Sequence, residues 1–373
     1  MKGWRDVAAV LSFLILIIGA FGACGTSGNG DGEEPSEEIQ FFAYVSNYDS
    51  DNITQYRMDP DTGVLYSLDP PSVAAVDLPR DLAVDPLGRY VYVPNLGSDN
   101  ISQYAISTDG TLSSLDPPSV AAGDWPRHAA VDPSGQYVYV ANIVSNNISQ
   151  YAVSTDGTLS SLDPPSVATS LAPLSFVVDP LNRYVYVTNR DSDNISQYAI
   201  STDGTLSSLD PPSVAASDTP IGIAVDPSGR YVYTANYDSD NISQYAISTD
   251  GTLFSLDPPY VTAGDRPNNV AVDPSGHFVY VTNSNSGNIS QYAISTDGTL
   301  SSLDPPLVAA GSGPVGIAVD PSDRYVYVTN GNSDNISQYG ISTDGTLFSL
   351  DPPSVATSEA PFSIGLVHRL IED

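Results

Sequence analysis

Basic residues are scarce in this chain, and lysine is almost absent from it. The 373 residues include 12 Lys and Arg against 44 Asp and Glu, which gives a net charge of −32, and Lys2 is the only lysine. Because nucleic-acid backbones bind to basic surfaces, we expect no nucleic-acid partner. The negative field also repels small anions, unless a local group of arginines overrides it.

Cysteine and glutamate are equally scarce. Cys24 is the only cysteine, so the chain cannot form an internal disulfide and its stability must come from packing. No glutamate occurs between Ile39 and Ser358, so every carboxylate side chain in that stretch is an aspartate. The sequence also has no P-loop, no zinc-ligand spacing and no Ser-His-Asp motif. We therefore predict no cofactor.

The N-terminal residues have the pattern of an export signal. Basic residues precede an apolar run from Val7 to Gly19, and small residues stand directly before Cys24. This pattern resembles the bacterial lipoprotein signal, in which the cysteine becomes the lipidated N-terminus. We expect residues 1–23 to be a signal peptide and Cys24 to anchor an exported protein through its lipid alone, on the periplasmic side of the outer membrane or at the cell surface. An uncleaved N-terminal anchor is the alternative.

Residues 24–38 and residues 39–373 differ sharply in composition. The first segment is rich in Gly, Ser and Glu without apolar periodicity, which predicts a flexible linker. The second carries the motif Asn-Ile-Ser-Gln-Tyr (the NISQY motif) six times, with one variant at Asn52–Tyr56. The six copies begin at Asn100, Asn147, Asn194, Asn241, Asn288 and Asn335, at a constant step of 47 residues. Seven copies at this period predict a ring or array of repeats.

Each repeat contains four strand-like runs, as the unit Pro126–Ala168 illustrates. The runs are residues 128–131, 137–141, 147–154 and 157–162, and turn-forming sequences separate them. Four short strands per repeat without helical periodicity are typical of one β-propeller blade. The predicted fold is therefore all-β: a seven-bladed β-propeller with four-stranded antiparallel blades.

The repeated aspartates are expected to build turns. Asp132, which precedes proline, can accept backbone N–H groups, and Asp156-Gly157 suits a hairpin that needs a positive φ. The sequence Asp-Ser-Asp-Asn, found at Asp191–Asn194 and in two other repeats, also invites a calcium interpretation. Its spacing matches no established calcium loop, so we predict no metal site.

The two chain ends are expected to share one blade. The first repeat lacks an innermost strand, and Pro361–Val367 stands 47 residues after the inner strand that begins at Pro314. We predict that this C-terminal strand completes the N-terminal blade and removes an exposed sheet edge. His368 is expected to lie beyond this strand, and His277 in a turn.

The phrase Gly123–Asn142 (GDWPRHAAVDPSGQYVYVAN) resembles the seven-bladed propellers of the lactonase-like, YVTN-repeat group. The tetrapeptide Tyr-Val-Thr-Asn itself stands at Tyr186–Asn189, Tyr280–Asn283 and Tyr327–Asn330. The resemblance covers the whole domain and implies the propeller fold. The group includes 6-phosphogluconolactonase-like enzymes, whose active site is associated with Arg, His and Glu near the channel mouth.

This resemblance makes Arg127 and His128 the candidate catalytic residues. His128 would activate water and Arg127 would stabilise the oxyanion, with Asp81 or Asp124 orienting the imidazole. The glutamate that often follows the second strand of the family pattern is absent, because Asn142 is followed by Ile-Val.

Loops from the fourth to the first strand and from the second to the third should share one face, and these loops vary most between repeats. A ligand is expected there, since variable loops on a uniform scaffold carry binding residues. The candidate binding residues on this face are Arg80, Asp81, Trp125, Arg127, His128, Arg190, Tyr237 and Arg266. Arginine and aromatic residues are frequent interface anchors.

Three functions are consistent with these features. The first is a non-catalytic, lipid-tethered and monomeric propeller that binds a protein or a glycan through its variable loops. The second is a lactone hydrolase that uses Arg127 and His128. The third is a surface structural repeat protein without a discrete ligand. The absence of glutamate from the ring and the export signal favour the first and the third.

Overall fold

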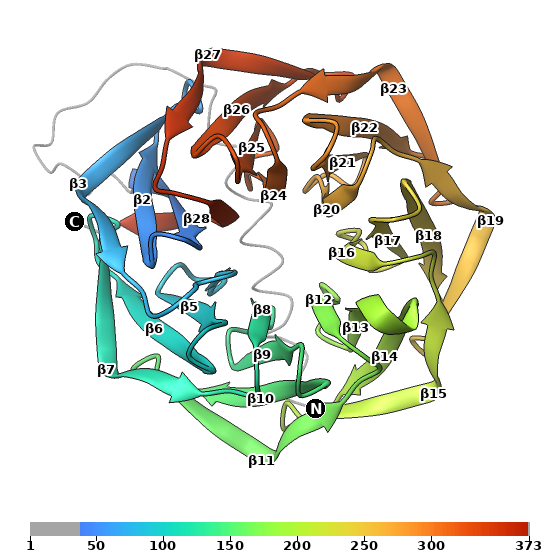
Figure 1. Cartoon of the computed structure of the whole chain (residues 1–373), viewed down its shortest axis with the longest axis horizontal. Helices are drawn as coiled ribbons and strands as arrows, with labels where there is room; N and C mark the ends of the chain where they lie inside the picture. Colours follow the sequence, from blue (N-terminus) through green and yellow to red (C-terminus); the bar gives the residue numbers. More distant parts are fainter. Residues whose placement is uncertain (1–37, 372–373) are drawn as a thin grey trace, which may run out of the picture. The chain divides into compact units, whose positions relative to one another are not determined.

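The computed structural model describes residues 38–371, which form seven antiparallel sheets of four strands arranged around a central axis (Figure 1). The predicted seven-bladed β-propeller is confirmed. The predicted signal peptide, the lipidation site at Cys24 and nearly all of the predicted linker lie outside the described residues. Within residues 38–371, no helix is long and apolar enough to cross a membrane.

The strands of each blade follow one another from the axis outward. The innermost strands are β28 (Pro361–Ile371), β4 (Ala83–Val84), β8 (Pro126–Val131), β12 (Pro173–Val178), β16 (Pro220–Val225), β20 (Pro267–Val272) and β24 (Pro314–Val319). The second strands are β1 (Glu38–Asn47), β5 (Tyr90–Asn95), β9 (Tyr137–Asn142), β13 (Tyr184–Asn189), β17 (Tyr231–Asn236), β21 (Phe278–Asn283) and β25 (Tyr325–Asn330).

The third strands carry the NISQY motif, and the fourth form the perimeter. The third strands are β2 (Asn52–Met58), β6 (Asn100–Ile106), β10 (Asn147–Val153), β14 (Asn194–Ile200), β18 (Asn241–Ile247), β22 (Asn288–Ile294) and β26 (Asn335–Ile341). The outer strands are β3 (Leu65–Ala74), β7 (Leu112–Ala121), β11 (Leu159–Ala168), β15 (Leu206–Ala215), β19 (Leu253–Thr262), β23 (Leu300–Ala309) and β27 (Leu347–Ala356). One short 3₁₀ turn, η2 (Arg190–Ser192), follows β13.

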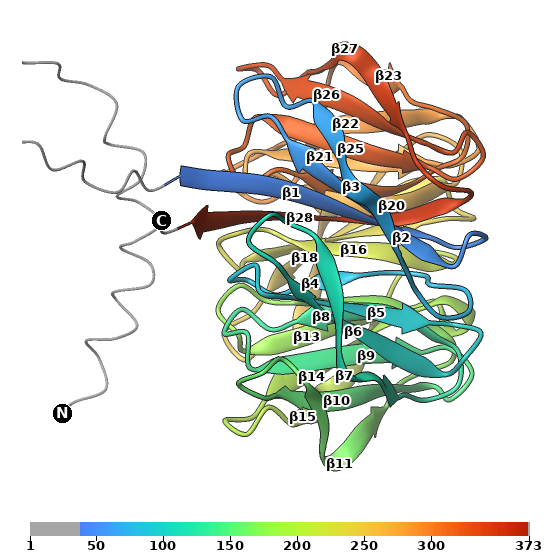
Figure 2. The ribbon, with the colours of Figure 1, turned by 90° about the vertical axis from the view of Figure 1, so that its left-hand side faces the viewer.

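The ring closes as predicted, because β28 pairs with β1 in a sheet ordered β28-β1-β2-β3. Both strands are longer than their counterparts, and their paired ends extend past the other blades in Figure 2. The expectation that His368 lies beyond the closing strand is wrong. Residues before Phe41 lengthen β1, so β28 continues to Ile371 and His368 pairs with Phe41.

The outer strands are also longer than predicted. In the blade built from the repeat Pro126–Ala168, the fourth strand is β11 (Leu159–Ala168), whereas the sequence predicted that it ends at Leu162. The ladder between β10 and β11 shifts register between Ser149 and Tyr151, and the Gln150 side chain there donates to the carbonyl of Pro164 at 2.9 Å. Proline lacks an N–H donor but is tolerated at a sheet edge, so the strand continues past Asp-Pro-Pro.

The NISQY motif locks neighbouring blades together. In the copy on β10, the Gln150 Oε1 accepts the N–H of Leu206 from the following blade at 2.6 Å. The Tyr151 hydroxyl donates to the carbonyl of Ala121 in the preceding blade at 2.7 Å. Ile148 is fully buried in the cluster between this blade and the next. The motif is therefore a structural element at its described positions.

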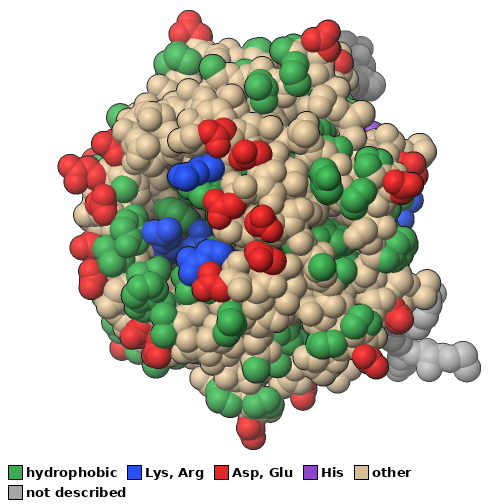
Figure 3. All heavy atoms as spheres, turned by 45° about the vertical axis from the view of Figure 1, so that its right-hand side comes forward, with side chains coloured by type: hydrophobic (Ala, Val, Ile, Leu, Met, Phe, Trp, Pro, Cys, Tyr) green, Lys and Arg blue, Asp and Glu red, His purple; other side chains and the backbone are tan. Residues whose placement is uncertain are grey.

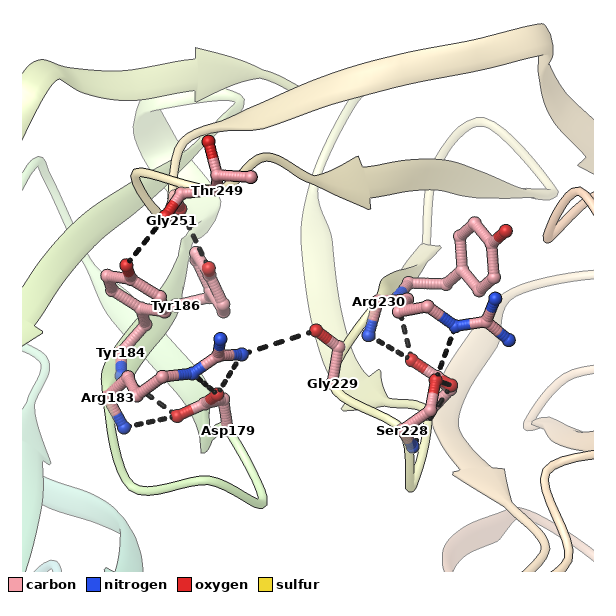
Figure 4. Close-up of polar contacts among 11 residues, drawn as sticks. Asp179, Arg183, Tyr184, Tyr186, Ser228, Gly229, Arg230, Thr249 and Gly251 are labelled. Carbon is pink, nitrogen blue, oxygen red and sulfur yellow. Dashed lines mark hydrogen bonds and ion pairs between the residues drawn. The ribbon is translucent and has the colours of Figure 1, made fainter.

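The aspartate turns form as predicted. Asp132 accepts the backbone N–H groups of Gln136 and Tyr137, each at 2.7 Å, and Gly157 has a φ of 87°. Figure 4 shows the equivalent turn at Asp179, where the Arg183 Nε donates to the carboxylate at 2.8 Å. We call the face that holds these turns the turn face, and the opposite face, formed by the variable loops, the mouth face.

Candidate functional site

A cavity of about 1100 Å³ opens at the mouth face on the axis of the ring. Figure 3 shows cationic side chains gathered around a hollow, with acidic side chains beside them. Among the residues that line it are six of the predicted binding residues: Arg80, Trp125, Arg127, Arg190, Tyr237 and Arg266. Asp81 and His128 line a narrower cavity of about 30 Å³ instead, which Arg127, Asn268 and Phe362 also border.

Arg80 and Arg127 form the cationic centre of the cavity. The Arg80 guanidinium lies 4.8 Å from the ring centre of Tyr48 and 4.1 Å from that of Phe362. Arg127 is only 8% exposed, and its Nη1 donates to the carbonyl of Leu174 at 2.7 Å. Aromatic faces and a backbone carbonyl thus hold both guanidinium groups in place without neutralising them.

Neither arginine forms an ion pair within residues 38–371. Burial lowers the pKa of Arg127 to about 9, and the charges of Arg80 and Arg190 also lower it. Burial likewise lowers the pKa of Arg80. Arginine keeps its charge at neutral pH, so two guanidinium groups face the cavity, and within residues 38–371 neither has a carboxylate within ion-pair distance.

Arg190 and Arg266 are engaged differently, nearer the rim. The Arg190 Nε lies 2.6 Å from Asp191 Oδ1, so this charge already has a partner. The Arg266 guanidinium stacks on the ring of Tyr237, 5.2 Å from its centre. An incoming anion would therefore meet its strongest attraction deeper, at Arg80 and Arg127.

His128 is engaged at both ring nitrogens. Its Nδ1 lies 2.6 Å from Asp81 Oδ2, and its Nε2 lies 3.0 Å from the carbonyl oxygen of Phe176. A carbonyl oxygen only accepts hydrogen bonds, so Nε2 must carry a proton, and Nδ1 faces a carboxylate. Both ring nitrogens therefore face acceptor oxygens, and neither points a free lone pair toward water.

Asp81 orients His128, which answers the question that the sequence left open between Asp81 and Asp124. Burial by itself would raise the pKa of Asp81. The charge of His128 and hydrogen bonds from His128, Ser363 and the Ala129 amide outweigh burial, so the pKa of this carboxyl is lowered overall. Asp124 lies in the rim loop, where its N–H donates to Ser145.

The second aspartate of the Asp-Ser-Asp-Asn loops anchors a neighbouring loop. Asp193 has a left-handed backbone with a φ of 48°, and its Oδ1 accepts the N–H of Thr219 at 2.9 Å. Asp240 accepts the N–H of Arg266 in the same way at 2.8 Å. Between residues 38 and 371, no group of three or more His, Cys, Asp or Glu side chains is placed to hold a metal ion.

Sequence reasoning missed the two rings that hold Arg80. Tyr48 is in the first repeat, and Phe362 comes from the closing strand β28, so only ring closure brings them together. Phe362 also lies 5.5 Å from the guanidinium of Arg127, measured to the ring centre. The available signal was the ring closure itself, since it places Pro361 and its neighbours on the channel wall.

The fold and this cavity define a seven-bladed propeller with a ligand-sized site at one end of its axis. Three overlapping segments, residues 81–257, 208–310 and 251–359, match the model of the Lactonase, 7-bladed beta-propeller family, so the chain belongs to this family. No curated protein matches the chain significantly.

Several solved structures share this fold. Two are described as putative 6-phosphogluconolactonases, from Bacteroides fragilis (TM-score 0.77, 19% identity, 88% of this chain and 98% of that one) and Bacteroides uniformis (TM-score 0.77, 21% identity, 88% and 99%). A third is a periplasmic gluconolactonase of Pseudomonas aeruginosa (TM-score 0.74, 20% identity, 88% and 99%). At these identities the likeness concerns the fold alone.

Proposed function

We propose that the mouth of the propeller binds an acidic glycan, with the carboxylate of a uronic acid held by Arg80 and Arg127. The observation that carries this proposal is the pair of convergent guanidinium groups without an ion pair in the described part of the chain. Like charges brought together in a partly dry cavity repel each other, and an anion relieves that repulsion. A local cationic cavity also overcomes the repulsion of the molecule's −32 charge.

The rest of the lining suits a saccharide better than a flat protein surface. Asn268, Asn285 and Asn332 line the cavity and offer amide donors and acceptors for hydroxyl groups. Asp238 also lines it, and its Oδ2 accepts a hydrogen bond from the Thr219 hydroxyl at 2.7 Å. Trp125 adds an aromatic face on which a sugar ring can stack. A concave site of this kind favours a glycan over the alternative protein partner.

The proposal is tested by titrating the protein with methyl β-D-glucuronide and with methyl β-D-glucoside, which differ by the carboxylate. We expect saturable binding of the glucuronide, weakening with added salt, and binding of the glucoside at least about tenfold weaker because charged hydrogen bonds contribute about 1.5–3 kcal/mol. Calorimetry measures both affinities, and Trp125 fluorescence gives an independent signal. Equal affinity for the two sugars would show that no carboxylate is recognised.

Lactone hydrolysis is a second candidate, supported by the family to which the chain belongs. Arg127 would stabilise the developing oxyanion, as the resemblance implies. The difficulty is the base, because both ring nitrogens of His128 already contact acceptor oxygens, those of Asp81 and Phe176. Hydrolysis of δ-gluconolactone followed at constant pH tests this candidate. No hydrolysis by the parent protein would exclude it for this substrate, and unchanged hydrolysis by His128→Ala would remove His128 as the base.

We also propose that the protein is exported and held to a membrane by a lipid on Cys24. The N-terminal sequence supports this, and the geometry of the ring suits it, since β1 begins and β28 ends on the turn face, away from the mouth. A tether at that end leaves the mouth accessible to a glycan. Cys24→Ala should move the protein from the membrane fraction to the soluble fraction and abolish labelling by palmitate. Unchanged membrane association would contradict the anchor.

A further inference from the structure

An exposed apolar ridge adjoins the cationic cavity on one side. It consists of Trp125, Val144 and Leu171, whose exposed fractions are 51%, 51% and 57%. Trp125 is also part of the cavity lining, so ridge and cavity are continuous. We call these three residues the apolar ridge. Exposed apolar side chains that form a contiguous patch usually mark a binding surface.

Backbone contacts tie the loops of the ridge together. The Ile143 N–H donates to the carbonyl of Trp125 at 3.0 Å, which places the loop of Val144 beside that of Trp125. The Ala172 N–H donates to Asn146 Oδ1 at 2.7 Å, so the loop of Leu171 lies against the same β9–β10 connection. The three side chains therefore come from adjacent loops of two consecutive blades.

The other repeats show that the fold does not require apolar residues at two of these positions. The residues equivalent to Val144 are Asp49, Gly97, Asp191, Asp238, Asn285 and Asn332. The residues equivalent to Leu171 are Asp77, Asp124, Asp218, Asp265, Ser312 and Glu359. At each position, six other repeats form the same loop with a small or polar side chain. The fold therefore does not require the apolar side chains of Val144 and Leu171, which lower solubility. Val144 and Leu171 stand on adjacent loops, and the loop of Val144 lies next to Trp125 of the cavity lining.

We propose that the ligand is an amphiphilic anion, namely an acidic saccharide that carries an alkyl or acyl chain. Its carboxylate lies at Arg80 and Arg127, and its chain leaves the cavity past Trp125 and covers Val144 and Leu171. This inference rests on the proposed function and adds the apolar part of the ligand. Charge complementarity at the cavity selects an anionic head, and the continuity of cavity and ridge fixes where its chain runs.

A bare membrane surface fits the same patch less well. The two arginines are recessed in the cavity, and Arg127 is only 8% exposed, so they cannot reach lipid phosphates in a flat surface. The net charge of −32 also opposes approach to an anionic leaflet. A single soluble amphiphile can enter the cavity and lie along the ridge, whereas a bilayer cannot follow that path.

The test uses methyl, butyl, hexyl and octyl β-D-glucuronides on the whole chain, each below its micelle concentration, with octyl β-D-glucoside as the uncharged comparison. We expect affinity to rise about twofold per methylene, which is less than full burial of each group would give because the ridge remains half open to water. Octyl glucuronide should thus bind about 100-fold more tightly than methyl glucuronide. Octyl glucoside should bind at least about tenfold more weakly than octyl glucuronide.

Two substitutions toward the repeat test the ridge itself. Val144→Asn and Leu171→Ser introduce uncharged residues found at these positions in other blades, so the loops should keep their conformation. Together they should remove most of the gain with chain length and leave methyl glucuronide binding unchanged. The control Phe348→Ser, at an exposed aromatic residue of the outer strand β27, should change neither affinity.

The outcomes separate this inference from the function on which it rests. If methyl glucuronide binds but longer chains gain nothing, the inference is overturned and the acidic-glycan site stands. If no glucuronide binds, the proposed function itself is overturned. If octyl glucoside binds as tightly as octyl glucuronide, the ridge is a general apolar surface and the amphiphilic-anion inference is overturned.

Discussion

At the residue scale, Asp323 holds a turn position where four other blades carry glycine and one carries Asn182. Both non-glycine residues have a positive φ, 62° for Asp323 and 55° for Asn182. The Asn182 amide donates to Asp132 of the neighbouring blade at 2.7 Å, whereas Asp323 meets another carboxylate, Asp273. Burial and the charge of Asp273 raise the pKa of Asp323 to about 6.

This carboxyl pair predicts a loss of stability with rising pH. The pKa of Asp323 is higher in the folded chain than in the unfolded one, so the folded chain binds more protons between about pH 4 and pH 6 and loses stability as pH rises through that window. Asp323→Asn replaces the repulsion by an amide donor and should add about 1 kcal/mol at neutral pH, a figure reduced for solvent screening. Thermal unfolding of the parent and of Asp323→Asn at pH 4.5 and pH 7.5 measures the difference in stability.

The reciprocal change Asn182→Asp is the matched control. It recreates the carboxyl pair in another blade, with Asp132 as the partner, and should lower the melting temperature at pH 7.5 more than at pH 4.5. If the melting temperature changed with pH in the same way in both variants and the parent, the predicted repulsion between Asp323 and Asp273 would be contradicted.

The candidate site was predictable at this scale only in part. Arg80, Arg127, Arg190 and Arg266 stand out because they depart from the repeat on one face. The state of their charges was not predictable, because it depends on which carboxylates lie close in space. Arg190 has an acidic partner next to it in the sequence, but nothing in the sequence says that Arg127 has no carboxylate partner among residues 38–371.

At the scale of elements, the third strands connect three blades through buried side chains. Gln150 is fully buried, and its amide group serves both Pro164 of its own outer strand and Leu206 of the next blade. Gln150→Ala leaves the buried N–H of Leu206 without a partner, whereas the carbonyl of the exposed Pro164 can turn to water, and the change should cost about 2 kcal/mol. Denaturant unfolding measures the loss, and Gln136→Ala, at an exposed turn residue, should cost almost nothing.

A loss of stability below about 1 kcal/mol would show that water or a neighbouring group replaces the hydrogen bonds of Gln150.

The sequence located the third strands well because their motif is nearly invariant. It placed the end of the outer strands too early, because Asp-Pro-Pro signals a turn in isolation. The Asp-Pro-Pro sequence fits within the outer strand because the β10–β11 ladder shifts register at Gln150. Such a shift depends on the neighbouring strand, so the sequence of the outer strand alone does not reveal it.

At the scale of the whole molecule, ring closure depends on β28. Removal of Pro361–Asp373 takes away the partner of β1 and the Phe362 ring that contacts both central arginines. We expect the shortened protein to melt at a lower temperature and to self-associate through the exposed edge of β1. An unchanged melting temperature and a monomeric elution profile would contradict the closure.

The intact ring is expected to be a monomer, because every outer strand carries Asp-Pro-Pro in its middle. Proline cannot donate to an added strand, so the perimeter resists edge-to-edge pairing. Light scattering after size exclusion tests this expectation, and a stable dimer would contradict it.

The overall fold was predictable because a period of 47 residues, repeated around a ring, is a property of the sequence itself. Closure followed from counting inner strands against outer ones. The cavity did not follow, since its depth and lining depend on how seven loops converge on one axis. The class of ligand did not follow from the repeat either, because it is inferred from the positions of Arg80 and Arg127 in the cavity.

The most direct test is therefore the affinity of methyl β-D-glucuronide for the protein with Arg80→Gln and Arg127→Gln, each alone and combined, measured by calorimetry. The control is Arg230→Gln, which removes an exposed arginine on the turn face. We predict a loss of about tenfold or more for each single variant, no measurable binding for the double variant, and parent affinity for Arg230→Gln. Parent affinity in the double variant would contradict the account.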